Sequence, residues 1–185
     1  MVSLMSLAVP IVVSAVFVFI VSSIIHMVLS YHQSDFARLP DEDAVAEALR
    51  RTGVQPGDYA VPFCDTPASM KDPKFLEKVR RGPNALLTVW AGGDMNMGPM
   101  LGQWFGFSLL VSFFTAYILS AVFAEGANYL AVFRVAGTVS FMAYGFGAIP
   151  YSIWFKRSWS TTVKSLLDAL VYGLMTAGAF GWLWP

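Results

Sequence analysis

Two long stretches of the chain contain no Asp, Glu, Lys or Arg. Residues 1–34 precede the first charge, Asp35, and residues 95–124 lie between Asp94 and Glu125. A helix of about 20 apolar residues is long enough to cross a bilayer core of about 30 Å. Both stretches exceed that length, so each predicts a membrane-spanning helix, and the chain is expected to be an integral membrane protein.

The apolar pattern predicts four spans in all. The first is expected to be a retained helix rather than a secretory signal, because no basic residue precedes it and it is longer than a typical apolar signal core. Pro10 lies near its start, where a missing backbone donor is tolerated, and Pro150 is expected to end the third span. The predicted spans cover residues 6–29, 103–123, 128–149 and 160–182.

The polar segment between the first two spans, residues 31–99, has local structure of its own. Acidic residues at the start and Gly53 after the end predict a helix over residues 41–52. Asp72 is expected to cap a second helix that Gly82 stops. Two β-favouring runs, residues 59–63 and 85–91, predict strands. The division expected is a first helix over 1–30, this small helix-strand-helix-strand cap, and a three-helix bundle over 100–185.

Composition supports the membrane assignment and excludes other classes. The chain is 56% hydrophobic and 13% charged, whereas soluble domains average about 25% charged. Twelve basic residues balance twelve acidic ones, so no basic excess points to nucleic acid. The only cysteine, Cys64, excludes an internal disulfide and a multi-cysteine zinc site.

The basic loop residues predict the topology. Basic residues gather in the polar segment and in the third connection, and the short second connection has none. The positive-inside rule therefore places the cap in the cytoplasm and both termini outside. The expected fold is an all-α membrane protein with four transmembrane helices and a small α/β cytoplasmic cap, in a bacterial inner membrane. The basic residues are Arg38, Arg50, Arg51, Lys71, Lys74, Lys78, Arg80, Arg81, Lys156 and Arg157.

Ionisable residues inside the spans are candidates for function. Arg134 lies about six residues into the third span, and such a charge costs about 2.5–3.5 kcal/mol on insertion scales. Asp168 in the fourth span is its expected partner, and Glu125 is a shallower alternative. The pair is interpreted as a structural pin between two spans, with a site for substrate, lipid or protons as the alternative.

Small residues recur every four positions in two spans. Such ladders allow helix backbones to approach closely, which helps helices associate in lipid. They are expected to serve packing, within one chain or between chains. The ladders are Ala169, Gly173, Ala177 and Gly181 in the fourth span, and Ser108, Ser112, Ala116 and Ser120 in the second.

A sulfur-rich stretch before the second span raises the possibility of metal binding. Thioethers are soft ligands that select Cu(I), and imidazole or thiolate groups elsewhere could complete a site. The alternative is a flexible apolar approach to the membrane, where methionine is common. His32 and Asp35, three positions apart, are expected to interact locally. The metal candidates are Met95, Met97, Met100, Cys64, His26 and His32.

No enzymatic motif is recognisable, because neither histidine pairs with a nucleophile motif and no glycine-rich loop has nucleotide-binding spacing. The expected function is therefore that of a non-enzymatic assembly or accessory component of the inner membrane, without a cofactor. An oligomeric transporter or channel for small solutes or ions is the main alternative, and a copper-handling protein or membrane enzyme is the other. The expected partners are the lipid bilayer and either another membrane protein or further copies of the chain.

Overall fold

A computed structural model describes residues 2–185. The chain forms two compact units: one contains residues up to 37 together with 96–185, and the other contains 38–95. Four helical segments are long and apolar enough to cross a membrane, as the sequence predicts. They are α1 (Ala8–Met27), α4 (Met97–Val122), α5 (Tyr129–Gly145) continued by α6 (Ala148–Trp154), and α7 (Trp159–Trp182).

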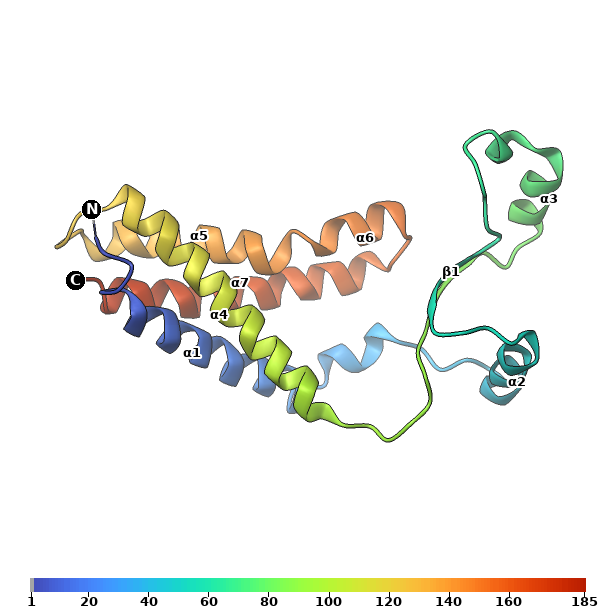
Figure 1. Cartoon of the computed structure of the whole chain (residues 1–185), viewed down its shortest axis with the longest axis horizontal. Coiled ribbons are helices and arrows are strands. Elements are labelled where there is room, and N and C mark those ends of the chain that lie inside the picture. The colour runs from blue at the N-terminus through green and yellow to red at the C-terminus, as the bar shows by residue number, and fades with distance from the viewer. Residues whose placement is uncertain (1) are drawn as a thin grey trace. The chain divides into compact units, whose positions relative to one another are not determined.

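In the helical unit, α1, α4, α5 and α7 run side by side (Figure 1). Both termini lie at the end that carries the connection between α4 and α5, where the backbone N–H of Gly126 donates to the carbonyl oxygen of Pro185. The connection from α1 to the second unit and the turn from α6 to α7 lie at the opposite end. This arrangement agrees with an even number of spans.

The small-residue ladder of α7 packs against α5 of the same chain. A Cβ added at Gly173 would lie 3.0 Å from the carbonyl oxygen of Gly137, and one added at Gly145 would lie 2.9 Å from the Cβ of Ala169. The other two ladder residues also touch α5, since Ala177 lies against Gly137 and Gly181 against a tyrosine ring. The two backbones are therefore in close contact, and larger side chains would separate them.

Hydroxyl groups of the α4 ladder link neighbouring helices. Ser112 hydrogen-bonds Ser14 of α1 across 2.8 Å, and both side chains are fully buried. One turn further along α4, Thr115 lies 3.2 Å from Ser140 of α5. Such bonds satisfy hydroxyls that would otherwise be unpaired in an apolar interior. In the ladder itself, Ser108 and Ala116 are also buried, whereas Ser120 is half-buried.

Two span boundaries differ from the prediction. Helix α4 begins at Met97, where the Asn96 side chain accepts a hydrogen bond from Gly98 N, so the methionine stretch is partly helical. The third span does not end at Ile149. Pro150 falls in the first turn of α6, where its missing N–H costs no intrahelical hydrogen bond, and the helix continues to Trp154.

The second unit has the predicted helix-strand-helix-strand order. Its elements are α2 (Glu42–Thr52), β1 (Gly57–Val61), the 3₁₀ turn η2 (Ser69–Lys71), α3 (Pro73–Arg81) and β2 (Ala85–Val89). The strands pair antiparallel, with Tyr59 opposite Leu87. Asp41 and Asp72 cap the two helices with their side chains, and Gly53 ends α2 at a φ of 67°, a conformation that favours glycine. No residue of this unit is buried.

The boundary predicted at residue 31 is wrong. The 3₁₀ helix η1 (Tyr31–Asp35) belongs to the helical unit. It is held there by side chains of α7, and these contacts form the most polar part of the helical unit.

Candidate functional site

The site begins where the chain leaves α1. After Met27 the chain turns, and η1 folds back against α7. Lys164 of α7 holds the turn at three points: its Nζ donates to the carbonyl oxygen of Tyr31 at 2.5 Å, to Ser34 Oγ at 2.8 Å and to Asp35 Oδ1 at 2.8 Å. The Lys164 ammonium thus uses all three of its protons within this turn.

Asp168 lies one turn of α7 beyond Lys164 and is 5% exposed. The hydroxyl of Tyr31 donates to Oδ1 of this carboxylate, and Nε2 of His32 lies 2.8 Å from Oδ2. The other ring nitrogen of His32, Nδ1, lies 2.7 Å from Asp35 Oδ2. The His32 imidazole therefore lies between two carboxylates, in an environment where water reaches only 15% of its side chain.

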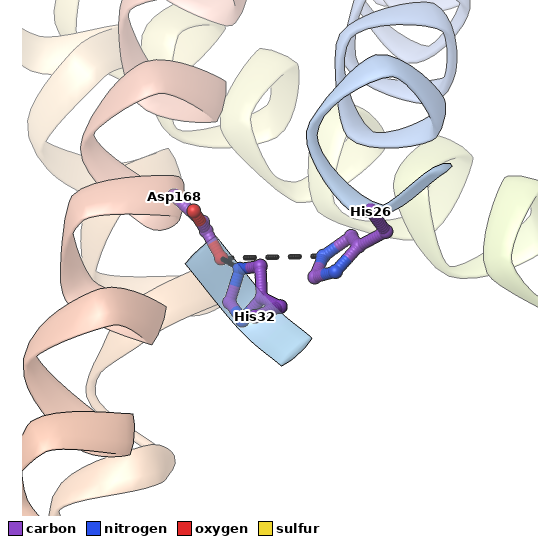
Figure 2. A group of neighbouring side chains, drawn as sticks. All are labelled: His26, His32 and Asp168. Carbon is purple, nitrogen blue, oxygen red and sulfur yellow. Dashed lines mark hydrogen bonds and ion pairs between the residues drawn. The ribbon is translucent and has the colours of Figure 1, made fainter. Parts of the chain in front are cut away.

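His26, in the last turn of α1, completes the cluster. Its Nε2 lies 4.0 Å from Asp168 Oδ2, and its ring centroid lies 4.4 Å from that of His32. Tyr172 OH is 3.4 Å from the same nitrogen. Figure 2 shows His26, His32 and Asp168 converging from α1, η1 and α7. One ligand atom of each of the three lies within 4.8 Å of the others.

The electrostatics of the turn favour an ionised Asp35. Burial by itself raises the pKa of Asp35, but hydrogen bonds with His32 and Lys164 outweigh burial and leave the pKa below its ordinary value. Burial, together with the hydrogen bond to Asp168, raises the pKa of Tyr31, so its phenol stays protonated and donates. A cation must then lie between His32 Nε2 and Asp168 Oδ2, because a nitrogen lone pair facing a carboxylate at 2.8 Å is repulsive. A proton or a metal ion meets this need.

A cavity of about 200 Å³ opens beside the three side chains. Trp104, Tyr144 and Tyr172 form one part of its lining, with ring centroids 5.4–6.2 Å apart. Arg157, from the turn before α7, lines another part. The cavity therefore combines an aromatic surface with a charged one.

The arrangement has the features of a metal site. Two imidazoles and a carboxylate are ligands for divalent first-row metals. Metal-binding histidines usually donate their second ring N–H to a carboxylate or carbonyl, which fixes the tautomer. Asp35 fits this role for His32, because it can accept the Nδ1 proton and leave Nε2 free to bind a metal.

Arg134 is not part of this site, and the predicted bridge to Asp168 is not formed. Among residues 2–185 no ion pair includes Arg134, whose side chain is exposed on α5. Asp168 is bound instead by Tyr31 and His32. Glu125 is also exposed, in the turn between α4 and α5. The expected pairing fails because η1 supplies Asp168 with nearer partners.

The metal candidates separate into two groups. The side chains of His26 and His32 lie in contact. Six residues apart on one continuous helix they would point to different faces, but His32 lies in η1, which folds back against α7. The methionines do not join them: Met95 is 89% exposed, and Met97 and Met100 are also exposed. Cys64 lies in the second unit, where its thiol donates to the carbonyl oxygen of Thr66.

The sequence analysis missed the roles of Tyr31, Tyr144, Tyr172 and Lys164. Lys164 and Asp168 are four positions apart and so lie on one face of α7, a spacing that indicates a shared environment. In the structure both residues bind η1 instead of each other. His32 and Asp35 do interact, as their spacing predicts.

Comparison with known proteins gives no matching family model, no matching curated protein and no matching solved structure.

Proposed function

We propose that this protein is a non-enzymatic, multi-pass component of a bacterial-type inner membrane that binds a divalent transition metal ion, such as Zn²⁺, through His26, His32 and Asp168. The observation that carries the proposal is the convergence of three ligand atoms within 4.8 Å. These side chains come from three separate segments of the chain, α1, η1 and α7. A bound ion would thus connect the end of the first span to the last span.

The distances suit an ion of this size. Ligand atoms at about 2.0–2.1 Å from a tetrahedral Zn²⁺ lie about 3.3 Å from each other. The two separations measured from Asp168 Oδ2, 2.8 Å to His32 Nε2 and 4.0 Å to His26 Nε2, lie on either side of that value. The longer separation belongs to His26, which has room to move toward an ion because its side chain is 50% exposed.

The surrounding groups support the ligands. Asp35 accepts from His32 Nδ1, and Lys164 in turn holds Asp35. Tyr31 donates to Asp168 Oδ1, which leaves Oδ2 directed at both histidines. Such outer contacts orient metal ligands and raise their affinity.

The ligand types favour zinc-like ions over copper(I). Imidazole and carboxylate suit Zn²⁺, Fe²⁺ and similar divalent ions, whereas Cu(I) prefers thiolate and thioether. The only cysteine and the three exposed methionines of the sulfur-rich stretch contribute no atom to this cluster. Three protein ligands also leave a fourth position for an exchangeable ligand, as in zinc sites that are not purely structural.

Cobalt titration tests the proposal. Purified full-length protein carrying no histidine tag is titrated with Co²⁺, whose visible absorption reports tetrahedral nitrogen and oxygen coordination. We expect one ion per chain, displaced by Zn²⁺, and a loss of binding of at least about 100-fold in His26→Asn. Glu125→Gln, which changes an exposed carboxylate outside the site, should bind like the unchanged protein.

His26→Asn is the informative variant, because His26 makes no hydrogen bond with Lys164 or Asp35, and its loss should leave their contacts intact. Undiminished cobalt binding by this variant, or binding that Glu125→Gln weakens equally, would contradict the proposed site.

The proposal places residues 38–95 in the cytoplasm, because eight basic residues lie in the predicted cap and two more in the other connection at the same end of the helical unit. Cys64 provides the test, as the only thiol of the chain. An impermeant maleimide should label it after the membrane is permeabilised and leave it unlabelled in intact cells. A cysteine introduced at Glu125 should behave in the opposite way. Labelling of Cys64 in intact cells would contradict this topology and place residues 38–95 outside.

A further inference from the structure

We propose that the cavity beside His26 and Asp168 binds a carboxylate, whose oxygen occupies the fourth position of the bound metal ion. This inference rests on the proposed metal site and adds the class of ligand that the site takes. Three features of the site support it: its charge balance, the hydroxyl of Tyr144 and the lining of the cavity.

The charges of the metal-bound site call for an anion. With a divalent ion bound, both histidines are neutral, and the carboxylates of Asp35 and Asp168 balance the cations of Lys164 and Arg157. The two positive charges of the ion then remain uncompensated. The other titratable groups facing the cluster, the phenols of Tyr31, Tyr144 and Tyr172, carry no charge at neutral pH. Unbalanced charge is costly beside the buried carboxylates of Asp35 and Asp168, so an anionic fourth ligand is favoured.

The hydroxyl of Tyr144 makes no hydrogen bond of standard geometry, although the buried Ser108 hydroxyl lies near it. Tyr144 lines the cavity, and its OH is the only buried side-chain nitrogen or oxygen among residues 2–185 without a hydrogen-bond partner. Buried polar groups are nearly always hydrogen-bonded, so an exception next to a cavity indicates a missing partner. A carboxylate has two acceptor oxygens, one for the metal ion and one for this phenol.

The lining and size of the cavity limit the rest of the ligand. The aromatic rings of Trp104, Tyr144 and Tyr172 favour a flat or short apolar body next to the carboxylate. A volume of about 200 Å³ lies below the 300–1,000 Å³ of sites for drug-sized molecules. These features fit a small organic acid better than inorganic phosphate, which has no apolar part.

The test uses the zinc-loaded, full-length protein in detergent, with benzoate as the probe and calorimetric titration as the measurement. We expect benzoate to bind to the zinc-loaded protein and not to the metal-free protein. Tyr144→Phe, which removes only the hydroxyl, should weaken benzoate binding about tenfold and leave zinc affinity unchanged. Tyr151→Phe is the matched control, because Tyr151 is exposed on α6 and does not line the cavity.

A fatty acid offers the same carboxylate chemistry, so dodecanoate is titrated in parallel. Binding of either acid supports a carboxylate site, and the one that binds more tightly shows whether the ligand is a small organic acid or a fatty acid. The small volume of the cavity predicts that benzoate binds more tightly. Inorganic phosphate that binds more tightly than benzoate would overturn the proposal, and so would equal benzoate affinity in Tyr144→Phe and the unchanged protein. Zinc binding without benzoate binding contradicts this inference alone, whereas absent zinc binding contradicts the metal site itself.

Discussion

Replacing Lys164 with leucine is expected to lower the free energy of unfolding by about 3–5 kcal/mol, the cost of removing one partner of a buried ion pair. The side chain of Lys164 is 16% exposed, and that of its partner Asp35 is 8% exposed. The substitution leaves this carboxylate without its cation and frees the Tyr31 carbonyl and the Ser34 hydroxyl. Denaturant unfolding of the protein in detergent measures the change.

A double-mutant cycle isolates the pair. Asp35→Leu should also destabilise the protein, while the Lys164→Leu/Asp35→Leu double variant should recover much of the combined loss, because no buried charge is then left unpaired. Lys74→Leu is the control, since Lys74 is exposed on α3 in the other unit. If the two single losses simply add, the residues do not stabilise the turn as a pair.

Saturating zinc is expected to stabilise the unchanged protein by about 2.7 kcal/mol at a free concentration 100 times its dissociation constant. The stabilisation follows because the ion binds ligands from α1, η1 and α7 that are brought together only in the folded state. A chelator should reverse it completely. Thermal unfolding in detergent, with and without zinc, gives the measurement.

The same measurement on His26→Asn separates metal binding from the fold. Because His26 is half-exposed, lies 4.0 Å from Asp168 and makes only one long hydrogen bond, at 3.4 Å to Tyr172, its replacement should change the stability of the metal-free protein little. The zinc-dependent increase should disappear. A variant that is stabilised as much as the unchanged protein would show that the ion binds elsewhere.

The sequence by itself determined the elements of this protein. Apolar runs of sufficient length predicted four helices, and local capping residues predicted the ends of the helices in the polar segment. Asp41, Asp72 and Gly53 act within a few residues of their own position, so their effects are visible in the sequence. The interaction of His32 with Asp35 is local in the same sense.

Only the tertiary structure decided which polar groups meet. Depth along the spans suggested Arg134 for Asp168, but a span position says nothing about a turn outside the span that folds back. Several contacts join η1 to α7: Lys164 binds Asp35, and Tyr31 and His32 bind Asp168. The packing of α1 against α7 brings His26 to the same carboxylate. The partners are separated by more than 130 residues, so no periodicity or cap relates them. Their meeting depends on helix packing and on the need of a buried carboxylate for donors.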